Sequence, residues 1–198
     1  GALLGMAAHL AGKGCSVLDM AGLAQKGGAV TSHIILAETP EAVTATHVAD
    51  GGADLLLGCD VVTAAAIPTL RKLQSDTLAV INTHQMMAGD FTRERDAVFP
   101  LRELLQSIEV RVDSGNIYEL DASKAAAKAF SESIAANLLM VGYAYQLGGL
   151  PLSSRAIEHA IEINGREIEM NLSAFRLGRA AAARPDDFRK ILERDEFH

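Results

Sequence analysis

The sequence is poor in several residue types, and these shortages narrow what the protein can be. It contains no tryptophan, 5% aromatic residues and two cysteines among its 198 residues. Cys15 and Cys59 lie far apart, so this chain alone cannot supply the four thiolates of an iron–sulfur cluster. Both stand in apolar runs, and we expect them to be reduced core thiols of a cytoplasmic protein.

Basic charge and long apolar runs are also scarce. Lysine and arginine number 18 against 25 aspartate and glutamate residues, which gives a formal net charge of −7. An acidic chain without a basic stripe argues against nucleic acid as the partner. Apolar runs stay well below the roughly 18 residues that suggest a membrane span, so no membrane partner is expected.

The spacings typical of independent catalysts and metal centres are missing as well. Six histidines are scattered along the chain, and the sequence gives no reason to place any of them against a nucleophile. Neither His-Glu-x-x-His nor Cys-x-x-Cys occurs, and there is no Gly-x-Gly-x-x-Gly phosphate loop. The sequence therefore predicts neither a catalytic residue nor a set of metal ligands in this chain.

What the chain does contain is enough apolar sequence, 49%, to fill one well-packed core. Short apolar runs predict buried strands at residues 15–19, 32–37, 53–57 and 77–81. Residues 110–112 and 117–120 are predicted to be two further short strands or a strand that enters a loop. Helical patterns lie between most of them, and from Ser123 onward the chain reads as helix only. This alternation predicts a single domain over residues 1–198, an α/β fold of three layers (α/β/α) with a mostly parallel central sheet and a helical C-terminal part.

The helical part carries clear local signals. An apolar stripe from Phe130 to Tyr145 predicts one long helix. Ser153 is a suitable N-cap for the next helix, and Gly165 a suitable stop. A last helix precedes Arg184, after which we expect a charged, frayed tail.

A glycine-rich loop joins the first two predicted strands. Gly22, Gly27 and Gly28 permit positive φ and close approach of a ligand or another backbone, and Gln25 and Lys26 stand immediately before the glycine pair. Open α/β sheets place their sites in loops that follow buried strands. The plainer interpretation, a turn with two solvated side chains, stays open.

Several polar residues occupy unusual places. Asp19 ends a predicted strand, where a nucleotide-binding fold would place a ribose-binding acid. Asn82 and His84 end a central strand, Asn137 lies on or beside the apolar stripe, and Asn171 is in the last helix. Either these side chains satisfy backbone groups at loops and helix ends, or they line one crevice together with Gln25 and Lys26.

Residues 22–30 also resemble the loop of the gamma domain of 2-oxoacid (pyruvate and indolepyruvate) ferredoxin oxidoreductases. Within that family the sequence is most similar to the long fused indolepyruvate ferredoxin oxidoreductases of bacteria. The resemblance spans nearly the whole chain and continues at residues 51–60, 137–145, 151–153, 156–157, 160–165, 169–171 and 174–178. It implies a gamma-type (pyruvate/ketoisovalerate oxidoreductase catalytic) domain that here lacks a preceding strand and glycine-rich loop.

The resemblance carries functional implications. Enzymes of this family oxidatively decarboxylate 2-oxoacids, aryl pyruvates for the indolepyruvate type, to acyl-CoA. They use thiamine diphosphate with Mg²⁺ and pass electrons through [4Fe-4S] clusters to ferredoxin. Those cofactors belong to other regions, so the resemblance implies a fragment that binds none of them alone and is inactive when isolated. The implied partners are the thiamine-binding and ferredoxin-like domains of the same enzyme, in a homo-oligomer.

The resemblance assigns few residues of this chain to a role. Gln25, Lys26, Gly27 and Gly28 are implied as an interface or substrate-side loop, and Asn137 and Asn171 are weaker transfers. Two other functions stay open from the sequence: a nucleotide- or CoA-binding module, and a structural dimerisation module without catalysis of its own.

Overall fold

The computed structural model describes residues 1–21, 29–85 and 99–193, and in that part the strands form two sheets. A parallel sheet has the order β3 (Leu55–Gly58), β4 (Leu78–Asn82), β5 (Ile117–Leu120). The other sheet is an antiparallel hairpin of β1 (Gly14–Ala21) and β2 (Val30–Ala37), paired along all eight residues.

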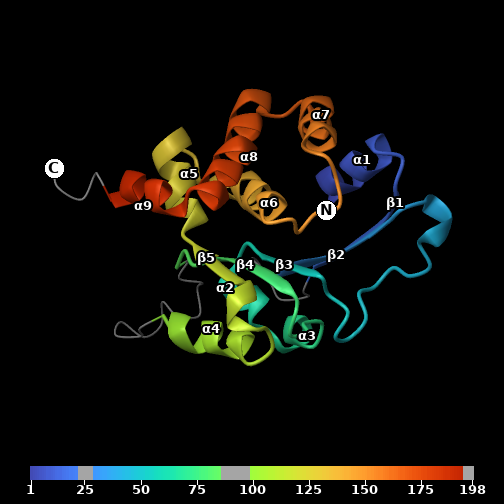
Figure 1. Cartoon of the computed structure of the whole chain (residues 1–198), viewed down its shortest axis with the longest axis horizontal. Helices are drawn as coiled ribbons and strands as arrows, with labels where there is room; N and C mark the ends of the chain where they lie inside the picture. The colour runs from blue at the N-terminus through green and yellow to red at the C-terminus, as the bar shows by residue number, and fades with distance from the viewer. Residues whose placement is uncertain (22–28, 86–98, 194–198) are drawn as a thin grey trace.

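Helices cover both faces of the parallel sheet and make three layers, which Figure 1 shows edge-on. One face carries the short helices α2 (Val61–Ala64) and α3 (Ile67–Leu70) together with α4 (Leu101–Glu109). The opposite layer consists of α1 (Ala2–Leu10), α5 (Ala122–Phe130), α6 (Ala136–Gln146), α7 (Ser154–Asn164), α8 (Ile168–Ala183) and α9 (Pro185–Glu193). Single 3-10 turns are η1 (Pro40–Ala42), η3 (Ser114–Asn116) and η4 (Ser133–Ala135).

Strand β4 shows why the sheet needs a helical layer on each side. Successive side chains of a strand point to opposite faces. Accordingly Val80 packs into the cluster built by α5, α6 and α8, whereas Ala79 and Ile81 pack into the cluster of α2 and α4. All three are fully buried. The predicted α/β fold with three layers and a mostly parallel sheet is confirmed.

The helical layer is held by a close contact between α6 and α8. Gly142 faces the carbonyl of Phe175, and Gly178 faces the carbonyl of Leu139, so closely that a Cβ on either glycine would overlap the opposite backbone. Two helices can approach to this distance only where the contact residues lack side chains. Phe175 is fully buried beside this contact.

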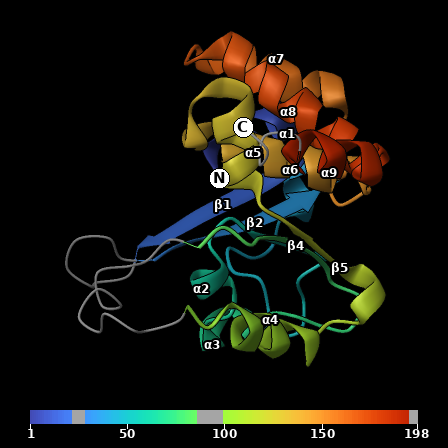
Figure 2. The same ribbon diagram turned by 90° about the vertical axis from the view of Figure 1, so that its left-hand side faces the viewer.

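The hairpin differs from the two buried strands that the sequence predicted there. The half of the hairpin that holds the start of β1 and the end of β2 packs against the helical layer. There Ile34 and Leu36 join the cluster that also receives Leu55 and Leu57 of β3. Toward the Ala21–Val30 end most residues of the hairpin are exposed, and in Figure 2 it extends beyond the helices. Val30 at the start of β2 is 63% exposed. The prediction that these apolar runs form strands is confirmed, but the prediction that both strands are buried was wrong.

Three other local predictions were also wrong. The expected long helix is two helices, because Ser131 takes a left-handed conformation (φ 58°) after α5 and η4 precedes α6. The expected strand at residues 110–112 is instead the C-cap and turn after α4. The tail after Arg184 begins with a helix, α9, for which Pro185 supplies the first position.

Candidate functional site

One side chain, Asn82, joins the carboxyl ends of the three parallel strands. Its Nδ2 donates to the carbonyl of Cys59 after β3 (3.2 Å) and to Oγ of Ser123 after β5 (3.0 Å). Its Oδ1 accepts from the backbone N–H of Ala122 (3.0 Å) and of His84 (3.3 Å). The residue is 5% exposed, so the desolvated amide is stabilised by these four bonds. The edge of the sheet where open α/β folds place ligands is therefore tied together.

Beside this amide, the carboxylate of Asp121 orients the imidazole of His84. His84 Nδ1 lies 3.1 Å from Asp121 Oδ1, and the same oxygen accepts from the backbone N–H of Lys124 (2.8 Å) and caps α5. A carboxylate only accepts, so Nδ1 carries the proton and Nε2 is the atom that accepts a proton. The two side chains are 40% and 34% exposed. This pair can exchange a proton with a molecule at the sheet edge or hydrogen-bond to it.

The end of β3 supplies two further polar residues with different roles. Asp60 caps α2, since its carboxylate accepts from the N–H groups of Val62 and Thr63, both at 3.2 Å. Cys59 is exposed, so the prediction that it is a core thiol was wrong. Cys15 is half-buried, and burial raises the pKa of its thiol, which keeps it protonated and a poor nucleophile.

The residues that the sequence selected for a crevice lie in different elements. Asp19 is an exposed residue of the hairpin and accepts from Oγ of Ser32, its cross-strand partner. Asn137 is exposed on α6, so its amide carries no burial cost there. Asn171 donates to the carbonyl of Arg166 (2.9 Å) and ties the α7–α8 connection. The hydrogen bonds of Asn82 and Asn171 agree with the hypothesis that these side chains satisfy backbone groups at loops and helix ends. A shared crevice stays a prediction.

The loop residues Gln25, Lys26, Gly27 and Gly28 lie outside the described residues. Their flanks do not: Ala21 and Val30 are the last cross-strand pair of the hairpin. In the described part, no three side chains of histidine, cysteine, aspartate or glutamate gather as metal ligands. Among the helices described there, none combines the length and the hydropathy of a membrane span.

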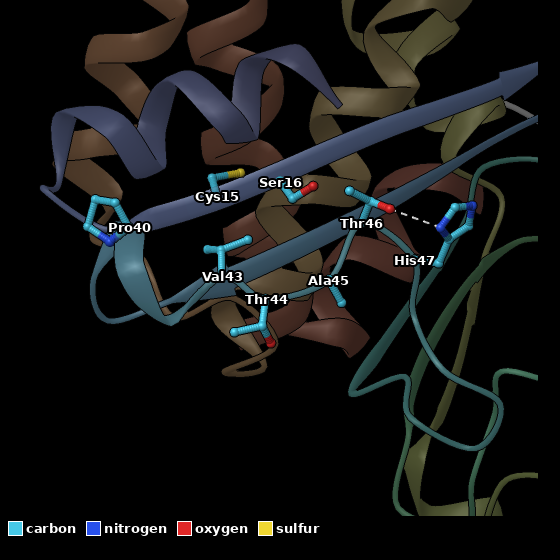
Figure 3. A pocket seen from close by; sticks show the side chains of 8 residues that line it. All are labelled: Cys15, Ser16, Pro40, Val43, Thr44, Ala45, Thr46 and His47. Carbon is cyan, nitrogen blue, oxygen red and sulfur yellow. Dashed lines mark hydrogen bonds between the residues drawn. The ribbon is translucent and has the colours of Figure 1, made fainter.

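Sequence reasoning missed a groove beside the start of β1. It has a volume of about 710 Å³ and opens widely to solvent. In Figure 3 its residues run along β1, with Pro40 at one end and His47 at the other. Its lining bears no carboxylate, lysine or arginine: Cys15, Ser16, Pro40, Val43, Thr44, Ala45, Thr46 and His47. An irregular stretch such as residues 43–47 has neither helical nor strand periodicity, so the sequence held no signal for this groove.

Comparisons with known proteins place this arrangement in a family. The family model described as pyruvate ferredoxin/flavodoxin oxidoreductase matches residues 1–181. Indolepyruvate oxidoreductase subunit IorB of Methanothermobacter thermautotrophicus is 31% identical over 167 residues, which cover 83% of this chain and 81% of that subunit. The subunit of the same name from Archaeoglobus fulgidus is 27% identical over 187 residues, 92% of this chain and 89% of the relative.

Solved structures agree on the fold. The gamma subunit of a keto/oxoacid ferredoxin oxidoreductase from Geobacter sulfurreducens superposes with a TM-score of 0.58 at 16% identity, covering 91% of this chain and 88% of that one. Pyruvate oxidoreductase subunit PORC from Thermotoga maritima gives 0.56 at 19% identity, covering 90% and 85%. The two curated relatives are archaeal, so they lend no support to the expected bacterial type. By the family match over most of its length, this chain belongs to the pyruvate ferredoxin/flavodoxin oxidoreductase family.

Proposed function

We propose that this chain is the gamma-type part, one domain over residues 1–198, of a 2-oxoacid ferredoxin oxidoreductase of the indolepyruvate type. The whole enzyme would convert aryl pyruvates to acyl-CoA by oxidative decarboxylation and reduce ferredoxin. The observation that carries the proposal is that the curated relatives, matched over more than four fifths of both chains, are indolepyruvate oxidoreductase subunits. The alternatives, a nucleotide-binding or a purely structural module, gain no support from these comparisons.

The redox cofactors of such an enzyme do not fit this chain. Two cysteines cannot ligate a [4Fe-4S] cluster, and the two free thiols lie in different parts of the fold. We therefore assign the clusters to the ferredoxin-like partner domains and, by the family resemblance, thiamine diphosphate and Mg²⁺ to the thiamine-binding ones. Thiamine diphosphate would supply the carbanion chemistry of decarboxylation there. This chain would contribute contacts through the loop of Gln25, Lys26, Gly27 and Gly28 at the end of the hairpin.

Location and assembly belong to the same proposal. Two unpaired thiols suit the reducing cytoplasm. Ferredoxin is the proposed electron acceptor, and we propose a homo-oligomer of the whole enzyme.

Substrate assays on the complete enzyme test the proposal. We expect reduction of ferredoxin to depend on an aryl pyruvate and CoA, with indolepyruvate giving a higher kcat/KM than pyruvate. Activity with neither 2-oxoacid would refute the proposed function.

The loop has its own test in the same enzyme. The double variant Gln25→Ala, Lys26→Ala should lower kcat or raise the KM for CoA at unchanged assembly, and Lys190→Ala on the exposed face of α9 is the control. If the double variant matches the wild type in kcat and in the KM for CoA, the loop has no part in catalysis.

A further inference from the structure

A single hydrogen bond to a histidine pins an irregular segment onto the hairpin. We call residues 43–50, which connect η1 to the region before β3, the strap. The backbone N–H of Val48 in the strap donates to Nδ1 of His33 at 3.0 Å. His33 belongs to β2, opposite Leu18 of β1, and is 8% exposed.

This bond exists in only one protonation state of the imidazole. An N–H donor requires a lone pair on Nδ1, so His33 is neutral and carries its proton on Nε2. Protonation would place an N–H on Nδ1 facing the N–H of Val48. The bond would then be replaced by a contact of two donors and a buried positive charge, and both are unfavourable without water.

The groups around His33 also disfavour its charge. From the strap, the ring of His47 meets the His33 ring edge-on at a centroid distance of 5.7 Å. From the turn after α3, Lys72 bridges to Asp50 at 2.8 Å, so the carboxylate of the strap is already paired. Burial lowers the pKa of His33 most, followed by the charges of Lys72 and His47.

The strand beside His33 adds no opposing charge. Leu18 is its partner in β1, and Asp19, the next residue, points to the opposite face of the hairpin. In the described part of the chain, the titratable groups that act on the imidazole are Lys72 and His47, and Lys72 is in turn paired with Asp50.

We propose that His33 is a pH-sensitive latch: in its neutral form it holds the strap against the hairpin, and protonation releases the strap. Residues 43–47 of the strap form a wall of the groove along β1, so release of the strap changes the shape of that groove. The latch does not depend on the proposed oxidoreductase function.

The direction of the pH effect follows from linkage. A histidine whose pKa is lower in the folded state than its ordinary value of about 6.5 stabilises the fold fully above that pH. The contribution is lost as the pH falls below about 6.5 and through the folded pKa. Acid, not base, is therefore expected to open the strap.

Hydrogen–deuterium exchange on the complete enzyme between pH 8 and pH 5 tests the latch, with peptides that cover residues 43–50 and rates corrected for intrinsic exchange. Protection of the Val48 amide should fall by up to about tenfold per pH unit once His33 titrates, since its neutral fraction falls by that factor. The variant His33→Gln removes the titration and should make protection in the strap independent of pH. His9→Gln, an exposed histidine of α1, is the matched control and should behave as the wild type.

A second variant keeps the test decisive if His33→Gln does not fold. Lys72→Met removes a cation that lowers the pKa of His33, so the loss of protection should move to higher pH. Strap protection that is independent of pH in the wild type overturns the latch. So does an unchanged midpoint in Lys72→Met, or a pH dependence that persists in folded His33→Gln.

Discussion

The edge of the parallel sheet and the strap on the hairpin are both irregular segments held by one polar side chain, yet they are held very differently. Asn82 makes four hydrogen bonds with an amide that does not titrate, and these bonds connect three strands. His33 makes one hydrogen bond to the strap, through an atom that protonates. The first arrangement is stable over the whole physiological pH range, whereas the second responds to acid.

The same contrast extends to the strands themselves. Four of the five residues of β4 are buried, because helices cover both faces of the parallel sheet. In β1 a single residue is buried, and Asp19, Met20 and Ala21 at the far end are exposed. Stability is therefore concentrated in the three-layer body, and the hairpin supplies accessible surface at small energetic cost.

The largest effect should come from the helical contact of the body. Gly142→Ala pushes a methyl group into the carbonyl of Phe175, so α6 and α8 must separate, and we expect a loss of at least about 3 kcal/mol. Gly115→Ala, at an open position without positive φ, should leave stability unchanged within about 0.5 kcal/mol. Urea unfolding of both variants measures the difference. Equal stability of the two would mean that the helices are not in close contact.

The next largest effect should follow from removing the amide at the sheet edge. Asn82→Ala leaves the N–H of Ala122 and the carbonyl of Cys59 without their side-chain partner, which should cost about 3 kcal/mol. Asn137→Ala removes an exposed asparagine and serves as the control, with a change below about 0.5 kcal/mol. A loss of unfolding free energy in Asn82→Ala as small as that of the control would show that water replaces the network and that the edge is not rigid.

A matched substitution compares the two sheets directly. Val80→Thr in β4 buries a hydroxyl where the wild type has a methyl group, and we expect a loss of about 2 kcal/mol. Val30→Thr in β2 makes the same change at a residue that is 63% exposed, with an expected loss below about 0.5 kcal/mol. The free energies of unfolding of the two variants, measured by chemical denaturation, test this expectation. Similar losses would contradict the division into a buried sheet and an exposed hairpin.

The smallest effect concerns a surface ion pair of the body. Arg176 donates two hydrogen bonds to Glu158, both 3.0 Å, and the pair lowers the pKa of that carboxyl. Stabilisation is present above the ordinary glutamate pKa of about 4.3 and is lost as the pH falls below it. Solvent screens the pair, so the loss of stability in Glu158→Gln should be near the detection limit at pH 7. At pH 3 the variant should be as stable as the wild type. Thermal unfolding at both pH values, with Glu132→Gln as control, checks the sign.

Local chemistry explains which elements could be predicted. The hydroxyl of Ser153 accepts from the N–H of Ala156 (3.1 Å) at the start of α7, and Gly165 ends that helix with φ 71°, both as expected. Pro68 lies in the first turn of α3, where its missing N–H costs nothing. Such signals act within a few residues and need no partner from elsewhere in the chain.

The misjudged elements depend on distant contacts. Apolar spacing runs on through the break at Ser131, because residues on both sides of it face the same core. The strand character of β1 and β2 was visible, but they pair as an antiparallel hairpin in which most residues near the Ala21–Val30 end are exposed. The candidate site also has a predictable and an unpredictable part. The sequence placed Asn82 and His84 at a strand end. It could not reveal their partners Asp121 and Ser123, which lie about 40 residues further along the chain.

By itself, the sequence determined the α/β class, the family resemblance, the ends of α7 and the absence of a cluster-binding cysteine set. The family resemblance rests on motifs along nearly the whole chain, and the other properties follow from composition, periodicity and capping, which are properties of neighbouring residues. Only the tertiary structure decided that Asn82 ties three strands, that Asp121 orients His84, and that His33 is buried under a strap. Such properties arise because burial and hydrogen-bond partners are set by segments far apart in the chain, and no local pattern encodes which segments meet.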